Sequence, residues 1–145
     1  MPNHILIKKR IANFKKKISV SGDKSISIRW VLFASIASGI SKARNLLISE
    51  DVLAAINIIK KFGIKVIQKK GFFIIFGKGI DGYNFRKNTV INAGNSATLG
   101  RLILGLIINS TKTIKLVGDK SLSRRDFKRV TSPLSRFGAK FKLKK

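Results

Sequence analysis

The sequence contains no cysteine and a single histidine, His4, among its 145 residues. Without cysteine, disulfide bonds and thiolate metal sites are excluded. His4 stands near the start of the chain, where an exposed terminal side chain is a simpler interpretation than a metal ligand or a general base. Because no metal-ligand cluster is apparent elsewhere, we expect no metal site. With only 6 acidic residues, the chain also has few groups for acid–base chemistry.

Long hydrophobic runs are absent too. No run of about 18 uncharged apolar residues occurs, so we expect no transmembrane helix and no membrane partner. The basic start is not followed by a long apolar core and a small-residue cleavage site, so we expect a cytoplasmic protein without a secretory signal. The apolar fraction of 44% is sufficient for a packed core, and the length suits one domain or a piece of a larger one.

Positive charge is abundant: 31 Lys and Arg residues give a net charge of +25. Such a charge is typical of proteins that bind polyanions such as RNA or DNA. However, the lysines are scattered among apolar positions, and the abundance of Ile, Lys, Asn and Phe is typical of AT-rich coding. Only one Tyr and one Trp are present for base stacking. We therefore expect nucleic acid not to be the partner, and keep a non-catalytic basic module that binds nucleic acid or another polyanion as the alternative.

Hydrophobic periodicity predicts an α/β chain. Strands are expected at residues 14–20, 42–48, 64–68, 72–76, 89–93 and 112–117 and from Ala139 onward. Helices are expected at 25–37, 50–62 and 97–108, with a last one ending near residue 136. The strands 64–68 and 72–76 are expected to form a hairpin.

The first predicted helix carries apolar residues that recur at helical spacing. Ile26, Trp30, Phe33 and Ala37 are predicted to form its buried face, and Gly39 is predicted to end it.

The chain holds an internal repeat with a period of a little over seventy residues. The segment KKFGIKV at 60–66 resembles SRFGAKF at 135–141, and Arg29 corresponds to Arg101. This spacing predicts two βαβα-then-strand units, the second of them incomplete.

Two segments share the frame GDKSxSxR: GDKSISIR at 22–29 and GDKSLSRR at 118–125. They do not occupy equivalent places in the repeat. The partner of the first is AGNSATLGR at 93–101, because both precede the first helix of a unit. The match is therefore either chance or the use of the same residue types at different helix starts.

A glycine-containing turn that leads into a helix exposes backbone N–H groups and the positive end of the helix dipole. The first such start offers Lys24, Ser25 and Arg29, and Ser25 and Arg29 lie on the same side of a helix. A single cation at a helix end is usually just solvated. We expect the helix starts to converge on one strongly anionic ligand. The other two starts supply these further residues: Asn95, Ser96, Thr98, Arg101, Ser121, Ser123, Arg124 and Arg125.

From about residue 14 to its end, the chain resembles the N-terminal part of the 3-phosphoshikimate 1-carboxyvinyltransferase (5-enolpyruvylshikimate-3-phosphate synthase) family. The motifs that carry the resemblance are, in order, SGDKSISIR, SEDVLAAINIIKKFG, AGNSATLGRL and GDKSLSRRDF with PLSRFGAKF. The resemblance implies repeated βαβαββ units of an inside-out α/β barrel, truncated in this chain. Residues 19–87 would form the first unit and 88–145 an incomplete second, and the strand segment 1–18 would pair with a second domain absent here.

The resemblance also implies a reaction without a cofactor. The 5-hydroxyl of shikimate 3-phosphate adds to C2 of phosphoenolpyruvate, and the adduct loses phosphate to leave an enolpyruvyl ether, a step toward chorismate and the aromatic amino acids. Lys24 would contact both substrates, Ser25 and Arg29 would hold the shikimate phosphate or carboxylate, and Arg125 would bind phosphoenolpyruvate. Three further residues are expected to support the site: Asn95, Thr98 and Arg101.

Three positions depart from the family pattern. Ala97 occupies a place where many members have glycine beside phosphoenolpyruvate, as in the glyphosate-insensitive class, so we expect weaker binding of glyphosate. Ile28 replaces the usual His or Asn and need not face a ligand. Asp126 replaces a proline, and its carboxylate is predicted to weaken the hold of Arg125.

The largest departure is length, since family members are near three times as long. Their acid–base residues would lie beyond Lys145, so we assign no catalytic residue within this chain. The missing remainder of the enzyme is expected as a partner, and the isolated chain is not expected to turn over alone.

Overall fold

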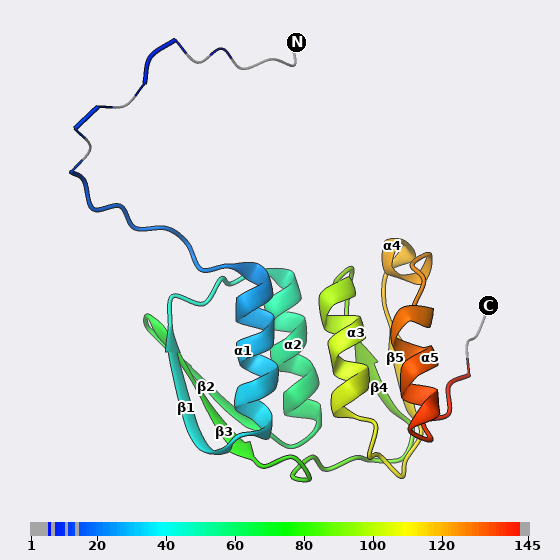
Figure 1. The fold of residues 1–145 in the computed structure, drawn as a ribbon. Helices are drawn as coiled ribbons and strands as arrows, with labels where there is room; N and C mark the ends of the chain where they lie inside the picture. Colours follow the sequence, from blue (N-terminus) through cyan, green and yellow to red (C-terminus); the bar gives the residue numbers. More distant parts are fainter. Residues whose placement is uncertain (1–5, 7, 11, 14, 143–145) are drawn as a thin grey trace.

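The computed structural model describes residues 6, 8–10, 12–13 and 15–142, so His4 lies outside the described residues. The elements run in the order α1 (Lys24–Ile36), β1 (Ser38–Arg44), α2 (Glu50–Lys61), β2 (Lys65–Lys69), β3 (Phe72–Lys78), β4 (Thr89–Asn92), α3 (Ala97–Leu106), β5 (Ile114–Val117), α4 (Lys120–Ser123) and α5 (Lys128–Arg136). The helices α1, α2, α3 and α5 stand side by side, and the strands lie against them (Figure 1). None of the helices in this part of the chain has the length and apolar character that crossing a membrane requires.

The first sheet has three antiparallel strands in the order β1-β3-β2. Val66 of β2 and Ser41 of β1 both pair with Ile75 of β3, which confirms the predicted hairpin. Gly71, in the turn, has the positive φ of 80° that glycine adopts without strain.

The start of β1 differs from the prediction. Gly39 does not end α1 but lies within β1, which begins at Ser38. The cause is a close approach of β3 to the end of α1: a Cβ at Gly77 would lie 2.2 Å from the carbonyl oxygen of Ala37. The chain that leaves α1 therefore pairs with β3 at once.

The second sheet is a parallel pair, β4 and β5, joined by α3. Thr89 pairs with Ile114 and Asn92 with Val117. A parallel pair needs a crossover connection, and α3 supplies it. The predicted strands 89–93 and 112–117 and the helix between them are confirmed.

The buried face of α1 is not the predicted one. Ile28 and Val31 are fully buried, whereas Ile26 and Phe33 are 68% and 63% exposed. Apolar residues occur on both sides of this helix, so their spacing does not determine which side packs against α2 and β3. Trp30 is partly buried at the edge of the core.

Both predicted terminal strands are wrong within the described residues. Residues 15–20 and 139–142 form no strand, while Phe14 and residues 143–145 lie outside the described part. A strand requires a hydrogen-bonded neighbour, and the contact recorded for the first segment is one side-chain bond, from Asn45 Nδ2 to the Val20 carbonyl, 3.1 Å long.

Candidate functional site

The frame at residues 22–29 forms an aspartate-capped helix start. Asp23 Oδ1 accepts a hydrogen bond from the Ile26 amide at 2.7 Å, and Ser27 Oγ donates to the Asp23 carbonyl at 2.7 Å. Ser27 Oγ also accepts from the amide of Leu47, which ties the start of α1 to the segment before α2. Gly22 is required by packing, because a Cβ there would lie 2.1 Å from the Asn45 carbonyl oxygen.

The frame at residues 118–125 has the same local structure. Asp119 Oδ1 accepts from the Leu122 amide at 2.7 Å, and Ser123 Oγ donates to the Asp119 carbonyl at 2.7 Å. The two frames therefore encode one capping motif, used at two helix starts. They diverge afterwards, because α4 ends at Ser123 and leaves Arg125 beyond the helix, whereas Arg29 lies inside α1.

The third helix start, that of α3, is capped by a serine. The Oγ of Ser96, which is buried, accepts from the Leu99 amide at 3.3 Å. The preceding turn passes through Gly94 at a φ of +57°, and the Gly94 carbonyl accepts a hydrogen bond from the Asp119 amide at 2.9 Å. This bond holds the starts of α3 and α4 against each other.

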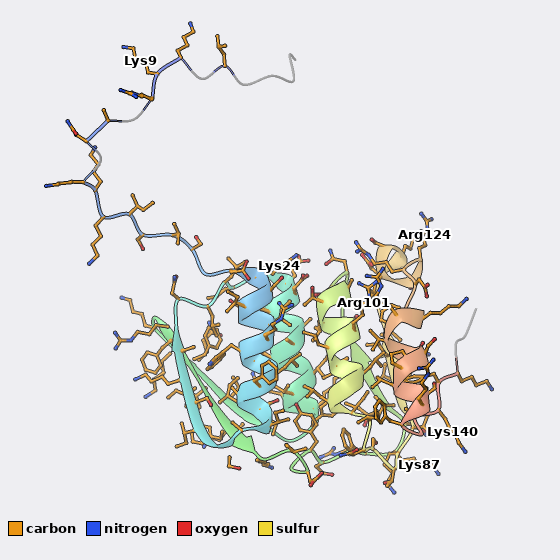
Figure 2. The ribbon with its side chains drawn as sticks, viewed as in Figure 1. Lys9, Lys24, Lys87, Arg101, Arg124 and Lys140 are labelled. Atoms are coloured by element: carbon orange, nitrogen blue, oxygen red, sulfur yellow. The ribbon has the colours of Figure 1, made fainter. Side chains whose placement is uncertain are left out.

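These helix starts surround one open pocket with a volume of about 340 Å³. The N-terminal ends of α1, α2 and α3 lie at the same end of the molecule as α4 (Figure 1), and Figure 2 labels Lys24 and Arg124 at that end. The lining residues are Lys24, Asp51, Asn95, Ser96, Ala97, Thr98, Ser121 and Arg125. The N-termini of α1, α2 and α3, together with Lys24 and Arg125, form a suitable site for an anion.

The pocket brings together seven of the residues that the sequence analysis expected at the site, and their binding roles stay predictions. They are Lys24, Asn95, Ser96, Ala97, Thr98, Ser121 and Arg125. Ser25 and Arg29 do not line this pocket. Ser25 is partly buried and Arg29 is exposed, one helical turn further along α1.

Arg101 does not line the pocket either. Its guanidinium donates from Nη2 to the Asp126 carbonyl at 3.1 Å and lies 5.7 Å from the ring centre of Phe127. It therefore braces the segment that follows Arg125. The Asp126 carboxylate accepts from the Lys128 amide at 2.7 Å at the start of α5, and no ion pair joins it to Arg125 within the described residues.

Asp51 is the site residue that the sequence analysis missed. It appears there only within the motif SEDVLAAINIIKKFG, yet the residue is 8% exposed and its Oδ2 lies 3.2 Å from Lys24 Nζ. The contact joins the starts of α1 and α2, two helices that pack side by side. No sequence signal identifies it, because the two residues meet only through that packing.

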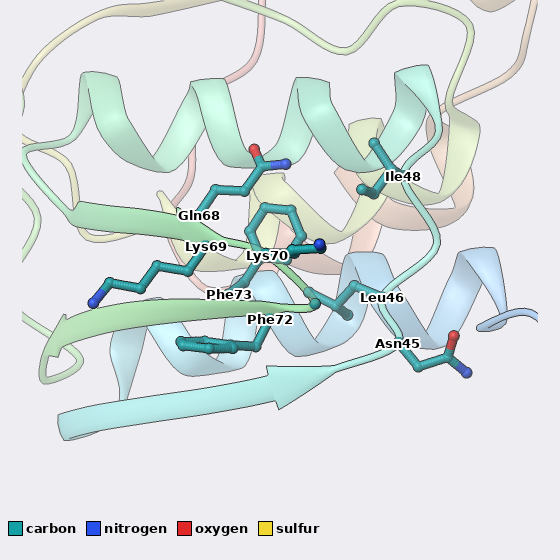
Figure 3. Close-up of a pocket in the computed structure, with 9 residues that line it drawn as sticks. Asn45, Leu46, Ile48, Gln68, Lys69, Lys70, Phe72 and Phe73 are labelled. Carbon is teal, nitrogen blue, oxygen red and sulfur yellow. The ribbon is translucent and has the colours of Figure 1, made fainter.

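A second pocket, of about 470 Å³, lies between the β2–β3 hairpin and the segment that leads from β1 to α2 (Figure 3). Leu46, Ile48, Phe72 and Phe73 contribute to its wall, and none of the described residues that line it is a carboxylate. The side chains of Asn45 and Lys69 point in opposite directions (Figure 3), so its polar groups do not converge. Among the residues that the structure describes, no three His, Asp or Glu side chains gather as a metal ion would require.

Comparison with known proteins gives a consistent result. The model of the family described as EPSP synthase (3-phosphoshikimate 1-carboxyvinyltransferase) matches residues 8–145. The 3-phosphoshikimate 1-carboxyvinyltransferase of Sulfurihydrogenibium sp. is 37% identical over 91% of this chain, and that of Bacillus cytotoxicus is 42% identical over 84%. The chain spans 30% and 28% of the length of these two relatives.

Solved structures of EPSP synthase from Acinetobacter baumannii are similar as well. One superimposes with a TM-score of 0.76 at 35% identity and covers 88% of this chain, and another has a TM-score of 0.78 at 34% identity. This chain corresponds to 29% and 28% of those chains. The predicted fold, a truncated portion of the enolpyruvate transferase architecture, is thereby confirmed.

Proposed function

The chain belongs to the EPSP synthase (3-phosphoshikimate 1-carboxyvinyltransferase) family, and we propose that it forms the N-terminal part of such an enzyme. The enzyme would transfer the enolpyruvyl group of phosphoenolpyruvate to the 5-hydroxyl of shikimate 3-phosphate. The hydroxyl loses its proton as its oxygen forms a bond to C2 of phosphoenolpyruvate, and C3 gains a proton to give a tetrahedral adduct. Loss of one proton from C3 and cleavage of the bond between C2 and the phosphate oxygen then restore the double bond and release inorganic phosphate. The observation that carries the proposal is the pocket in which Lys24 and Arg125 meet the starts of α1, α2 and α3.

We propose that phosphoenolpyruvate occupies this pocket. Its phosphate and carboxylate need several donors, and the pocket offers the ammonium of Lys24, the guanidinium of Arg125 and the hydroxyl of Thr98. Helix N-termini add partial positive charge directed at the same space. Ala97, the first residue of α3, would lie beside the ligand and narrow the space available to a longer one.

Shikimate 3-phosphate would lie next to that pocket, along the start of α1. Ser25 and Arg29 lie on one side of the helix. Ser25 is partly exposed and Arg29 is exposed, so a ligand phosphate or carboxylate could reach both side chains. Lys24 precedes Ser25 in the chain and lines the pocket, so it would reach both substrates.

The acid–base groups would come from the remainder of the enzyme. Among the described residues, Asp51 is the single carboxylate that lines the pocket, and Lys24 already engages it. The missing part would also supply the partner for residues 1–18, while 19–87 and 88–145 would form successive units of one domain. A cytoplasmic location is part of the same proposal and is tested by cell fractionation.

Calorimetric titration of the chain with phosphoenolpyruvate tests the proposal. We expect binding that is lost in Arg125→Ala and retained in Arg124→Ala, since Arg124 is the adjacent exposed arginine and does not line the pocket. Ser25→Ala and Arg29→Ala should instead weaken the binding of shikimate 3-phosphate. Equal losses in both arginine variants, or binding of a random RNA but of neither substrate, would favour a non-specific polyanion binder.

A further inference from the structure

We infer that Asp51 is a positioning residue that holds the ammonium group of Lys24 at the pocket in the orientation that an anionic ligand requires. This inference rests on the proposed function. It assigns Asp51 a role through Lys24 and not through direct contact with a substrate.

The first argument is the selectivity of the contact. The chain has 31 cationic side chains and 6 acidic ones, yet within the described residues a single ion pair forms, between Lys24 and Asp51. The carboxylates of Asp23, Asp119 and Asp126 instead accept bonds from backbone amides. The one acid committed to a cation therefore lies in the pocket.

The second argument is burial. Asp51 is 8% exposed, and Lys24 Nζ is the recorded partner of its carboxylate. A buried carboxylate is strongly unfavourable without a cation or hydrogen-bond donors, so Asp51 restrains the ammonium that neutralises it. The Lys24 side chain is 53% exposed and has a long flexible stem, so it has little other restraint.

The third argument is the location at two helix starts. Lys24 is the first residue of α1, where the helix dipole disfavours a cation, and Asp51 is in the first turn of α2, where the dipole favours an anion. Without Asp51, the ammonium would be driven away from the helix ends and toward water. With it, the ammonium stays 3.2 Å from the carboxylate, and a group with three donors can still serve a ligand on its other side.

This role predicts the opposite sign from simple charge repulsion. A carboxylate beside an anion site should weaken anion binding, so its removal should tighten phosphoenolpyruvate binding if charge alone matters. If Asp51 positions Lys24, its removal should weaken that binding.

A double-mutant cycle on phosphoenolpyruvate affinity separates the two. We expect Asp51→Ala to weaken binding roughly five- to tenfold, and to have no further effect in a Lys24→Met background. Glu50→Ala, the neighbouring exposed acid in the same helical turn, is the matched control and should change affinity less than about twofold. Asp51→Asn, which preserves the shape of the side chain, repeats the measurement with less disturbance to folding.

Tighter binding by Asp51→Ala, or equal losses on the wild-type and Lys24→Met backgrounds, would overturn the inference. A second measurement needs no ligand: the NMR order parameter of the Lys24 side chain should fall in Asp51→Asn and stay constant in Glu50→Ala. If the wild-type chain does not bind phosphoenolpyruvate, the proposed function fails, whereas an unchanged order parameter in Asp51→Asn rejects the restraint of Lys24 itself.

Discussion

The amide of Asp119 donates a hydrogen bond to the carbonyl of Gly94 at 2.9 Å, and this bond joins the start of α4 to the turn before α3. It places Ser121 and Arg125 beside Ala97 in one pocket, although more than twenty residues separate them in the chain. The contact depends on Gly118, because a Cβ there would lie 2.4 Å from Leu122 Cδ2 and 2.7 Å from the Gly94 oxygen.

Gly118→Ala is therefore expected to reduce the free energy of unfolding by about 1–3 kcal/mol through overpacking. Gly105→Ala is the control, because Gly105 lies in α3 with nothing within 4 Å of an added Cβ, and it should increase stability by up to about 1 kcal/mol. Urea unfolding followed by circular dichroism measures both. Equal midpoints for Gly118→Ala and the wild type would show that the two helix starts are not tightly joined.

Arg101 is expected to support Arg125 from a distance. Arg101→Lys keeps the charge but cannot reproduce the guanidinium bond to the Asp126 carbonyl together with the packing on Phe127, so it should cost about 1 kcal/mol of stability. Because the segment after Arg125 is then less well held, phosphoenolpyruvate binding should weaken by a few fold. Arg129→Lys, at an exposed position of α5, should leave both quantities unchanged. Urea unfolding measures the stability and calorimetry the phosphoenolpyruvate affinity of each variant, and an Arg101→Lys protein that matches the wild type in both would contradict this role.

Much of the arrangement of helix starts follows from sequence. Gly22 and Gly118 precede aspartates that cap helices, and such local hydrogen bonding depends on neighbouring residues alone. The parallel pair around α3 also follows, because its pattern is local and its crossover is required.

Features that depend on tertiary packing could not be predicted in the same way. The ion pair between Lys24 and Asp51 exists because α1 and α2 pack side by side. The outward direction of Ile26 depends on which side of α1 packs against α2 and β3. Arg101 has the residue type and spacing of a ligand-binding arginine. Its guanidinium is instead engaged by two residues far along the chain, through a hydrogen bond to the Asp126 carbonyl and packing on the Phe127 ring.

Tyr83 provides a pH probe of the core. Its hydroxyl is hydrogen-bonded to Ser35, and burial raises its pKa above the ordinary value of 10.0, an effect that the hydrogen bond to Ser35 partly offsets. Since the folded state holds the phenol proton more tightly than the unfolded state, the stabilisation is fully present below pH 10.0 and is lost as the pH rises through the folded pKa.

Tyr83 is the one tyrosine of the chain, so the absorbance of tyrosinate reports on it alone. The titration midpoint should lie above 10.0 in buffer and return to about 10 in concentrated urea. Tyr83→Phe should remove this contribution of the phenol to the loss of stability at alkaline pH. A folded midpoint at or below the urea value would contradict the buried position.

Ala97→Gly tests the space beside the proposed phosphoenolpyruvate site. Ala97 lines the pocket at the first turn of α3, and its methyl group should obstruct glyphosate, which is slightly longer than phosphoenolpyruvate. Removal of that methyl should tighten glyphosate binding about tenfold or more relative to phosphoenolpyruvate, whose affinity serves as the internal control. Competition calorimetry gives both values, and an unaltered ratio would refute the steric explanation.

The exposed side of α1 is expected to limit the solubility of the isolated chain. Ile26 and Phe33 are separated by two helical turns on one face and are 68% and 63% exposed, an arrangement that favours burial against another surface. Ile26→Ser with Phe33→Ser should reduce self-association measured by sedimentation while the free energy of unfolding changes by less than about 1 kcal/mol. Ile28→Ser, on the fully buried side of the same helix, should cost about 3 kcal/mol or more and unfold much of the population. If the double variant unfolds as Ile28→Ser does, this side of α1 packs internally, and it would then be unavailable to the remainder of the enzyme.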